Sequence, residues 1–436
     1  MSSLVKQSLR ILLGRAGVSA ISLLFTVYFA YELPKNLFAL IALYSTAASF
    51  TQVMIDLGLS AKMVREAPFL LKAGSNPEEA VRTVIMPSVL LRFFAAFVVC
   101  LTMITFLQMM EGLLSAEFST LNVEFIILLA PVSMMFENGN ASLASIFQVQ
   151  RRFGLDSFLT SGATLLEMIF ATILYLNFGM NQYFTGVLIA QASLFLIRIY
   201  LCRDILRLFT FRKLKMKESI LILKEYWPYY LRRFFRFGIL QGEQLLVVIL
   251  LPLAQLADFN LAKKLSKYLK FYIEAFTNPL IMKLSKNRDI NLRRRHARHF
   301  LMFTIPIPII LCVLSPWIMQ IAGGEKYASS WYILAVLYAS YVFYAFSNLQ
   351  ISVITIFGKG TDLLFRDAIG SVIGLFTTLA LILLFGQYGL AWGQLIAYLT
   401  LYITGYQISK KYMNADTPSN ENQGEPPATL IPADPA

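Results

Sequence analysis

Charged residues are scarce in this chain. Asp, Glu, Lys and Arg make up 14% of its 436 residues and hydrophobic residues 57%, whereas soluble domains carry about 25% charged residues. The stretches 300–324, 327–358 and 368–409 contain no Asp, Glu, Lys or Arg. Because a helix needs about 20 apolar residues to span a bilayer, this composition excludes an ordinary soluble domain and predicts an all-α polytopic membrane protein.

Metal-binding and redox-active residues are also few. The three cysteines have no spacing typical of a metal site or a disulfide framework, and the only two histidines, His296 and His299, share one basic segment. No catalytic triad or phosphate-binding glycine loop is apparent. We therefore expect no metal, no cofactor and no catalytic residues, and predict that the protein is not an enzyme.

Hydrophobic segments predict twelve transmembrane helices. Their expected ranges are 9–32, 37–58, 83–109, 123–148, 157–178, 182–203, 229–253, 258–283, 299–322, 328–356, 363–386 and 388–411. A low-identity match at a shift of 221 residues, such as Arg15 with Arg236, favours two homologous halves. The predicted organisation is an N-terminal six-helix lobe at 1–203, a basic linker at 204–227, a C-terminal six-helix lobe at 228–412 and a disordered tail at 413–436.

Basic residues in the predicted loops lie almost entirely on one side of the membrane. By the positive-inside rule, both termini are expected in the cytoplasm. This asymmetry accounts for the net charge of +13 and predicts contact with anionic membrane lipids. Nucleic acid is not expected as a partner.

The segment 258–279 carries an unusual set of charges for a transmembrane helix: Lys263, Lys264, Lys267, Lys270 and Glu274. All but Lys264 are spaced i, i+4, i+7, i+11 and share one helix face, and Lys264 points about 100° away. Each charge facing lipid would cost about 2.5–3.5 kcal/mol. We therefore predict that Lys263, Lys267 and Lys270 face a water-filled cavity that binds an anionic substrate. The alternative, that the lysines lie in the outer interface, would leave only 271–282 as an apolar span, which is too short.

Other charges lie inside predicted spans. Arg15 and Arg92 are further candidates for substrate binding, with snorkelling or pairing to a nearby acid as the alternative. Four acids could be structural partners of these bases or protonatable sites that couple transport to H+ or Na+: Glu137, Glu167, Glu243 and Glu274.

Three motifs and the layout of six plus six helices resemble one transporter family. The first predicted helix reads ILLGRAGVSAISLLFTVYFA, the second ends in DLGLSAKMVREAP, and the eighth contains FNLAKKL. Over residues 1–412 the chain resembles the polysaccharide transporter or oligosaccharide flippase family, and in particular its O-antigen flippase-like members. This family lies within the multidrug/oligosaccharidyl-lipid/polysaccharide (MOP) superfamily.

The resemblance implies a V-shaped fold of two lobes, like that of the multidrug exporters (MATE) of the same superfamily. It also implies flipping of an undecaprenyl-diphosphate-linked oligosaccharide, such as an O-antigen or other lipopolysaccharide repeat unit, from the cytoplasmic to the periplasmic leaflet of a bacterial inner membrane. A polysaccharide polymerase and a chain-length regulator are potential partners in that setting. One alternative is a cation-coupled multidrug exporter, which requires an acidic cavity. The other is a polysaccharide polymerase or ligase. Such an enzyme requires a sizeable extracytoplasmic loop, which the predicted topology lacks.

Overall fold

A computed structural model describes residues 21–56, 59, 84–109, 123–149, 152–204, 216–287 and 300–414, and the structural statements below concern these residues. They form helices and no strand. A helix at Ile21–Glu32 comes first. It is followed by α2 (Lys35–Asp56), α5 (Met86–Met109), α7 (Val123–Val149), α8 (Phe153–Phe178), α9 (Met180–Leu201), α11 (Met216–Leu250), α12 (Leu253–Asn287), α14 (Pro306–Gly323), α15 (Glu325–Ala328), α16 (Trp331–Phe357), α17 (Gly360–Phe385) and α18 (Gln387–Asn414).

Each of the twelve predicted spans coincides with one helix over the part of the chain that is described. Seven of these helices are long and apolar enough to cross a membrane by length and composition alone. The largest difference is α11, which begins at Met216, inside the segment predicted as a linker, and continues through Pro228. Arg15 and the tail at 415–436 lie outside the described residues, so the expectations for them remain predictions.

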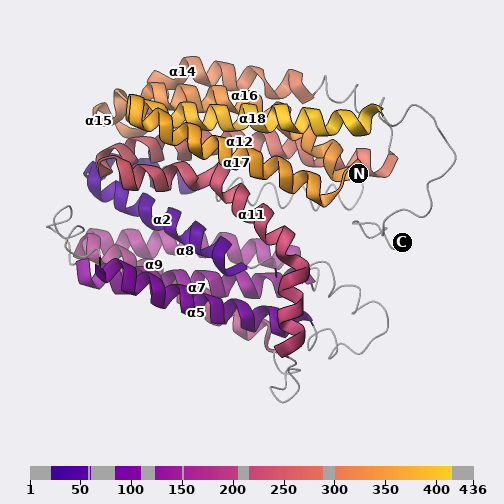
Figure 1. The fold of residues 1–436 in the computed structure, drawn as a ribbon. Coiled ribbons are helices and arrows are strands. Elements are labelled where there is room, and N and C mark those ends of the chain that lie inside the picture. Colours follow the sequence, from indigo (N-terminus) through magenta and orange to yellow (C-terminus); the bar gives the residue numbers. More distant parts are fainter. Residues whose placement is uncertain are drawn as a thin grey trace.

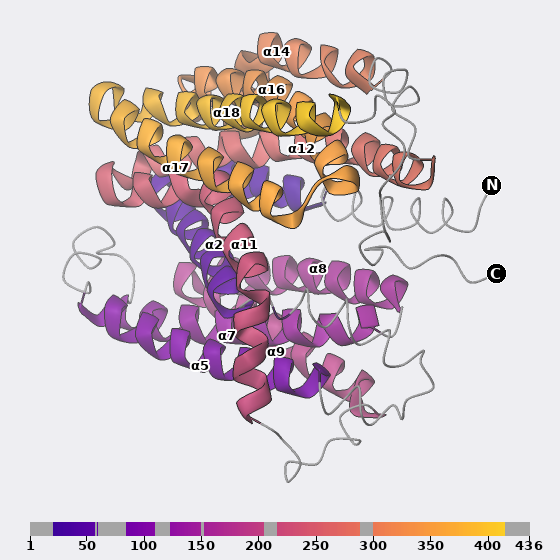
Figure 2. The same ribbon diagram turned by 45° about the vertical axis from the view of Figure 1, so that its right-hand side comes forward.

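The helices form two groups (Figure 1). We call the helix at Ile21–Glu32 with α2, α5, α7, α8 and α9 the N-lobe, and α11, α12 and α14–α18 the C-lobe. The 45° view in Figure 2 shows the same division, with α2 and α11 lying between the groups. α2 packs on α11 and α12 of the C-lobe as well as on α5 and α7 of its own lobe. α2 and α12 are therefore central elements, and side chains on α12 can face either lobe.

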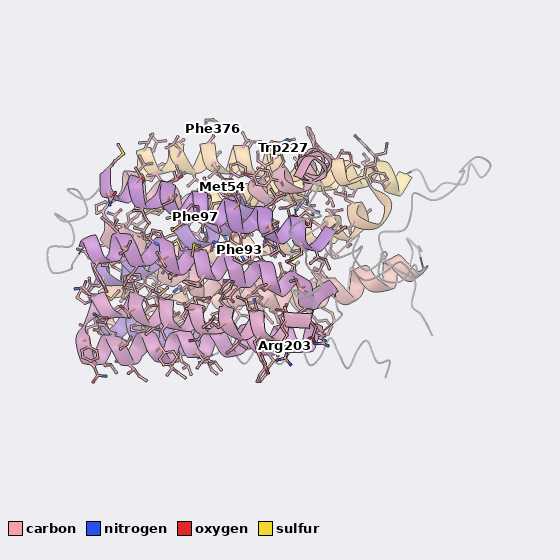
Figure 3. The ribbon with its side chains drawn as sticks, turned by 90° about the horizontal axis from the view of Figure 1, so that it is seen from below. Met54, Phe93, Phe97, Arg203, Trp227 and Phe376 are labelled. Atoms are coloured by element: carbon pink, nitrogen blue, oxygen red, sulfur yellow. The ribbon has the colours of Figure 1, made fainter. Side chains whose placement is uncertain are left out.

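Large apolar side chains cover the outside of the bundle. Phe97 on α5 and Phe376 on α17 are exposed, and Phe376 projects outward in Figure 3. Exposed apolar surface on this scale is unusual for a soluble protein. It is the surface expected of helices whose outer faces contact lipid.

Close helix packing within the N-lobe depends on a glycine. A Cβ atom added to Gly186 on α9 would lie 2.6 Å from the backbone nitrogen of Ala171 on α8. A backbone atom cannot move aside as a flexible side chain can, so only glycine permits this approach of α9 to α8.

The two lobes are joined at both ends of α2. Beside α15, Lys35 forms an ion pair with Asp258 of α12 at 2.6 Å, and the Lys326 amine donates to the carbonyl oxygens of Tyr31 and Leu33, each at 2.7 Å. At the other end of α2, Asp56 forms ion pairs with Arg92 of α5 at 3.3 Å and with Arg233 of α11. The space between these two ends holds the candidate site.

Candidate functional site

Two cavities lie on different sides of α12. The N-lobe cavity, of about 460 Å³, is lined from the helix at Ile21–Glu32, α2, α7, α8, α9 and α12. The C-lobe cavity, of about 270 Å³, is lined from α11, α12, α16, α17 and α18. The charged residues of α12 are thus divided between two environments.

Lys264 and Lys267 line the N-lobe cavity together with Tyr268 and Phe271 of the same helix. These four positions fall within one 100° sector of an α-helix. Neither lysine forms an ion pair with any described residue. Lys264 Nζ lies 5.7 Å from the centre of the Phe38 ring, and Lys267 Nζ lies 5.8 Å from that of Phe271. Such cation–π contacts are weak at hydrated sites, so both amines remain available to a ligand.

Two of the predicted coupling acids, Glu137 on α7 and Glu167 on α8, line the same N-lobe cavity. The Gln191 amide donates to Glu167 Oε2 at 2.7 Å, and the Gln191 side-chain oxygen accepts a hydrogen bond from Asn140 at 3.0 Å. Glu167 is therefore held by a polar network that leads into the N-lobe. The cavity lining combines two cationic and two acidic side chains.

Lys263 does not line the N-lobe cavity, although it lies only about 40° around α12 from Lys267. Its amine forms an ion pair with Glu243 of α11 at 2.6 Å, and the side chains of Lys263 and Glu243 are 14% and 4% exposed. A buried pair of this kind is costly to break, because the remaining charge loses its partner. This placement favours a structural role for both residues over the predicted contact of Lys263 with substrate and the predicted coupling role of Glu243.

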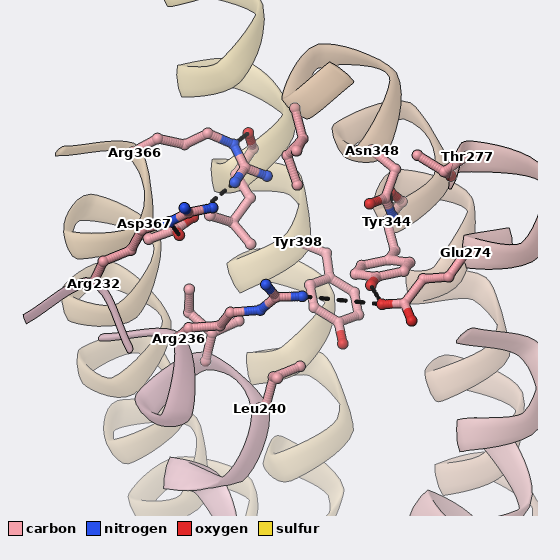
Figure 4. Close-up of a pocket in the computed structure, with 13 residues that line it drawn as sticks. Arg232, Arg236, Leu240, Glu274, Thr277, Tyr344, Asn348, Arg366, Asp367 and Tyr398 are labelled. Carbon is pink, nitrogen blue, oxygen red and sulfur yellow. Dashed lines mark hydrogen bonds and ion pairs between the residues drawn. The ribbon is translucent and has the colours of Figure 1, made fainter. Parts of the chain in front are cut away.

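The C-lobe cavity contains three arginines and two acids (Figure 4). Arg366 donates to Asp367 at 2.7 Å, and to Ser347 and the Leu401 carbonyl. Arg232 also pairs with Asp367, at 3.3 Å. Two of the arginines are thus tied into a buried network.

Glu274 and Arg236 face each other across the same cavity (Figure 4). The Tyr344 hydroxyl donates to Glu274 Oε1 at 2.7 Å, while Arg236 lies 4.0 Å from that oxygen. Lys270 of α12 lies 3.9 Å from the same oxygen. The predicted substrate residue Lys270 and the predicted coupling residue Glu274 are therefore neighbours on the C-lobe side of α12.

Arg92 is placed away from both cavities. Its side chain is 2% exposed, pairs with Asp56 and donates to Ser145 at 3.2 Å. This buried network favours the alternative of pairing with an acid, since a substrate in either cavity could not touch a side chain that lines neither of them. Arg15, the other predicted arginine, lies outside the described residues.

Two features were not anticipated from the sequence. Lys264 lines the same cavity as Lys267, although it lies about 60° around α12 from Lys267 and off the predicted lysine stripe. The ion pair of Asp56 with Arg233 joins residues from different lobes. The only signal for it was that Asp56 ends an apolar helix on the same predicted side of the membrane as the start of α11.

The fold of the chain is similar to that of known transport proteins. No protein-family model and no curated protein sequence matches the chain. Among solved structures, the chain is similar to the lipid II flippase MurJ in an inward closed conformation, with a TM-score of 0.73 and 16% identity over 92% of this chain and 87% of that one. The chain has the fold of the MOP superfamily.

Two MATE transporters are similar as well. An inward-facing multidrug resistance MATE transporter of the MOP superfamily gives a TM-score of 0.69 at 13% identity, over 93% of this chain and 98% of that one. A mutant of the MATE transporter VcmN from Vibrio cholerae gives a TM-score of 0.66 at 17% identity, over 95% of this chain and 97% of that one. The expected fold, with twelve helices in two lobes, is confirmed. Identities this low establish the fold alone, so the substrate must be argued from the site.

Proposed function

We propose that this MOP-fold protein is a transporter that moves an anionic, lipid-linked oligosaccharide across a membrane. The observation that carries the proposal is the pair of lysines, Lys264 and Lys267, which line the N-lobe cavity without an ion-pair partner among the described residues. Placing two charged amines on a membrane-spanning helix costs several kcal/mol of free energy unless water or an anion faces them. An oligosaccharide diphosphate supplies such an anion, and its headgroup cannot cross hydrocarbon unaided.

The finer expectations follow from this proposal. The lipid would be undecaprenyl diphosphate, the direction cytoplasmic to periplasmic, and the membrane a bacterial inner membrane that supplies O-antigen or another surface polysaccharide. Coupling to H+ or Na+ would involve Glu137 or Glu167, because these acids share the cavity with the lysines. A flippase and multidrug exporters among the similar structures support movement of a substrate through this fold.

The test measures surface-glycan export in the producing bacterium, with its own copy of the gene deleted and each variant supplied in its place. We expect Lys264→Ala and Lys267→Ala each to reduce export at least about tenfold, since each removes a charge-assisted contact worth about 1.5–3 kcal/mol. Lys267→Arg should retain part of the activity because the charge remains.

Arg203→Ala is the matched control. Arg203 follows α9, is half exposed and lies outside both cavity linings, so its loss should not change export. Normal export by both lysine variants, at wild-type levels of inserted protein, would refute the proposal.

A multidrug exporter is the second candidate, and the two acids of the N-lobe cavity favour it. A cationic drug would be attracted to Glu137 and Glu167, so Glu167→Gln should abolish efflux of ethidium while the two lysine variants retain it. Ethidium efflux that depends on the acids, with no dependence of glycan export on the lysines, would replace the flippase proposal by this one.

A further inference from the structure

Three side chains converge on one oxygen in the C-lobe. Tyr344 Oη lies 2.7 Å from Glu274 Oε1, Lys270 Nζ 3.9 Å and Arg236 Nη2 4.0 Å. They come from α16, α12 and α11, so Glu274 lies where three C-lobe helices meet. Figure 4 shows Glu274 and Arg236 reaching toward each other from opposite sides of the cavity.

The contacts of Glu274 with its two cations are loose. Hydrogen bonds between nitrogen and oxygen have lengths of about 2.7–3.2 Å, and both cations are farther away than that. Arg236 is 51% exposed and Glu274 30% exposed, so water reaches this part of the cavity. Arg366 and Asp367, by contrast, are 2% and 6% exposed and lie at 2.7 Å from each other.

Lys270 and Arg236 therefore have donor capacity that Glu274 does not satisfy. An oxyanion between them could accept hydrogen bonds from both at normal lengths, and a guanidinium binds a carboxylate or phosphate through two parallel bonds. Glu274 would have to move aside, because its negative charge would otherwise repel the incoming anion.

We propose that Arg236, which lines the C-lobe cavity, and Lys270, beside Glu274 at that cavity, form a second anion-binding site, in which Glu274 is an internal competitor that an anionic group of the substrate displaces. The site takes an oxyanion, either a phosphate or the carboxylate of an acidic sugar. This inference rests on the proposed function as a transporter of anionic substrate. It differs from that proposal by assigning to Glu274 a competing role in place of the coupling role predicted from the sequence.

The experiment measures anion binding directly by isothermal titration calorimetry. The protein is placed in nanodiscs of zwitterionic lipid and carries Lys264→Ala and Lys267→Ala, which removes the N-lobe amines as an alternative site. Inorganic pyrophosphate and glucuronate are the two probes. In this background we expect Glu274→Gln to bind at least one probe about tenfold more tightly, because a competing charge has been removed. The tighter probe identifies phosphate or sugar carboxylate as the preferred group.

Further variants separate competition from a change in folding. Glu274→Ser removes the same charge with a different side chain and should give the same increase. Adding Arg236→Ala to Glu274→Gln should abolish the gain, whereas adding Arg203→Ala should not. Affinity that is unchanged or weaker in both Glu274 variants, or a gain that persists without Arg236, would overturn the inference.

The outcomes also distinguish this inference from the proposed function. If the N-lobe lysine variants lose export but the Glu274 variants bind no more tightly, the transporter proposal stands and the second site does not. If the Glu274 variants bind more tightly while the lysine variants export normally, the C-lobe site stands and the N-lobe assignment fails.

Discussion

Neighbouring lysines of α12 have different surroundings. Lys263 is 14% exposed and pairs with Glu243 of α11, a helix of the C-lobe, at 2.6 Å. On the side facing the N-lobe, Lys264 and Lys267 line a cavity of about 460 Å³ and form no ion pair with described residues. Lysines only one to four residues apart thus differ in whether they form a direct ion pair with a described carboxylate. The paired lysine is suited to hold helices together, and the unpaired ones are suited to bind a ligand.

The largest loss of stability is expected from a substitution that breaks the ion pair of Lys263 with Glu243. Lys263→Ala should destabilise the protein by about 3–5 kcal/mol, since it leaves Glu243 buried without a counter-charge. Thermal unfolding of the purified protein in detergent would show this as a large fall in midpoint and in yield.

Lys267→Ala is the matched comparison for that measurement and should unfold like the wild type. Replacing the pair together, with Lys263→Met and Glu243→Gln, should recover most of the stability, because no unpaired charge is then left. If Lys263→Ala is as stable as Lys267→Ala, the distinction between paired and unpaired lysines on α12 is wrong.

A smaller effect is expected at Arg92, and it tests whether this residue belongs with the paired charges. Arg92→Gln removes one cation from Asp56 and leaves Arg233 in place. We expect a loss of about 1–3 kcal/mol in stability, measured by the same unfolding assay. Export per molecule of inserted protein should be unchanged. A specific loss of export at normal stability would instead support the predicted contact of Arg92 with substrate.

The smallest effect is expected where a pair is partly hydrated. Lys35 is 25% exposed and pairs with Asp258 at the α15 end of the lobe interface. Lys35→Ala should cost about 1–2 kcal/mol, less than Lys263→Ala, because water reaches Lys35 even though Asp258 is only 8% exposed. High salt should reduce the difference between wild type and variant. A loss as large as that at Lys263 would mean that burial does not separate strong from weak pairs in this protein.

Much of the architecture could be predicted from the sequence. Uncharged stretches such as 327–358 and 368–409 indicate membrane helices, because hydrocarbon excludes charge along their whole length. Their observed bounds agree with the predicted ones to within a few residues at most ends. The start of α11 was missed because the segment 216–227 is rich in charge, and a helix that is not embedded over its full length has no apolar run to reveal it.

The surroundings of the charged residues inside the helices could not be predicted from the sequence. Periodicity separates Lys263 from Lys264 by about 100° around α12 and groups Lys267 with Lys263, whereas Lys267 lines the N-lobe cavity together with Lys264. It does not say which neighbour lies at which angle. The sequence therefore determined the number and length of the spans and the concentration of cations on one helix, because these depend only on local composition. Tertiary structure alone decided that Glu243 neutralises Lys263, that Glu274 lies beside Lys270 and that Lys264 faces a cavity. Those outcomes depend on how α2, α11 and α16 pack around α12, which brings together residues far apart in the chain.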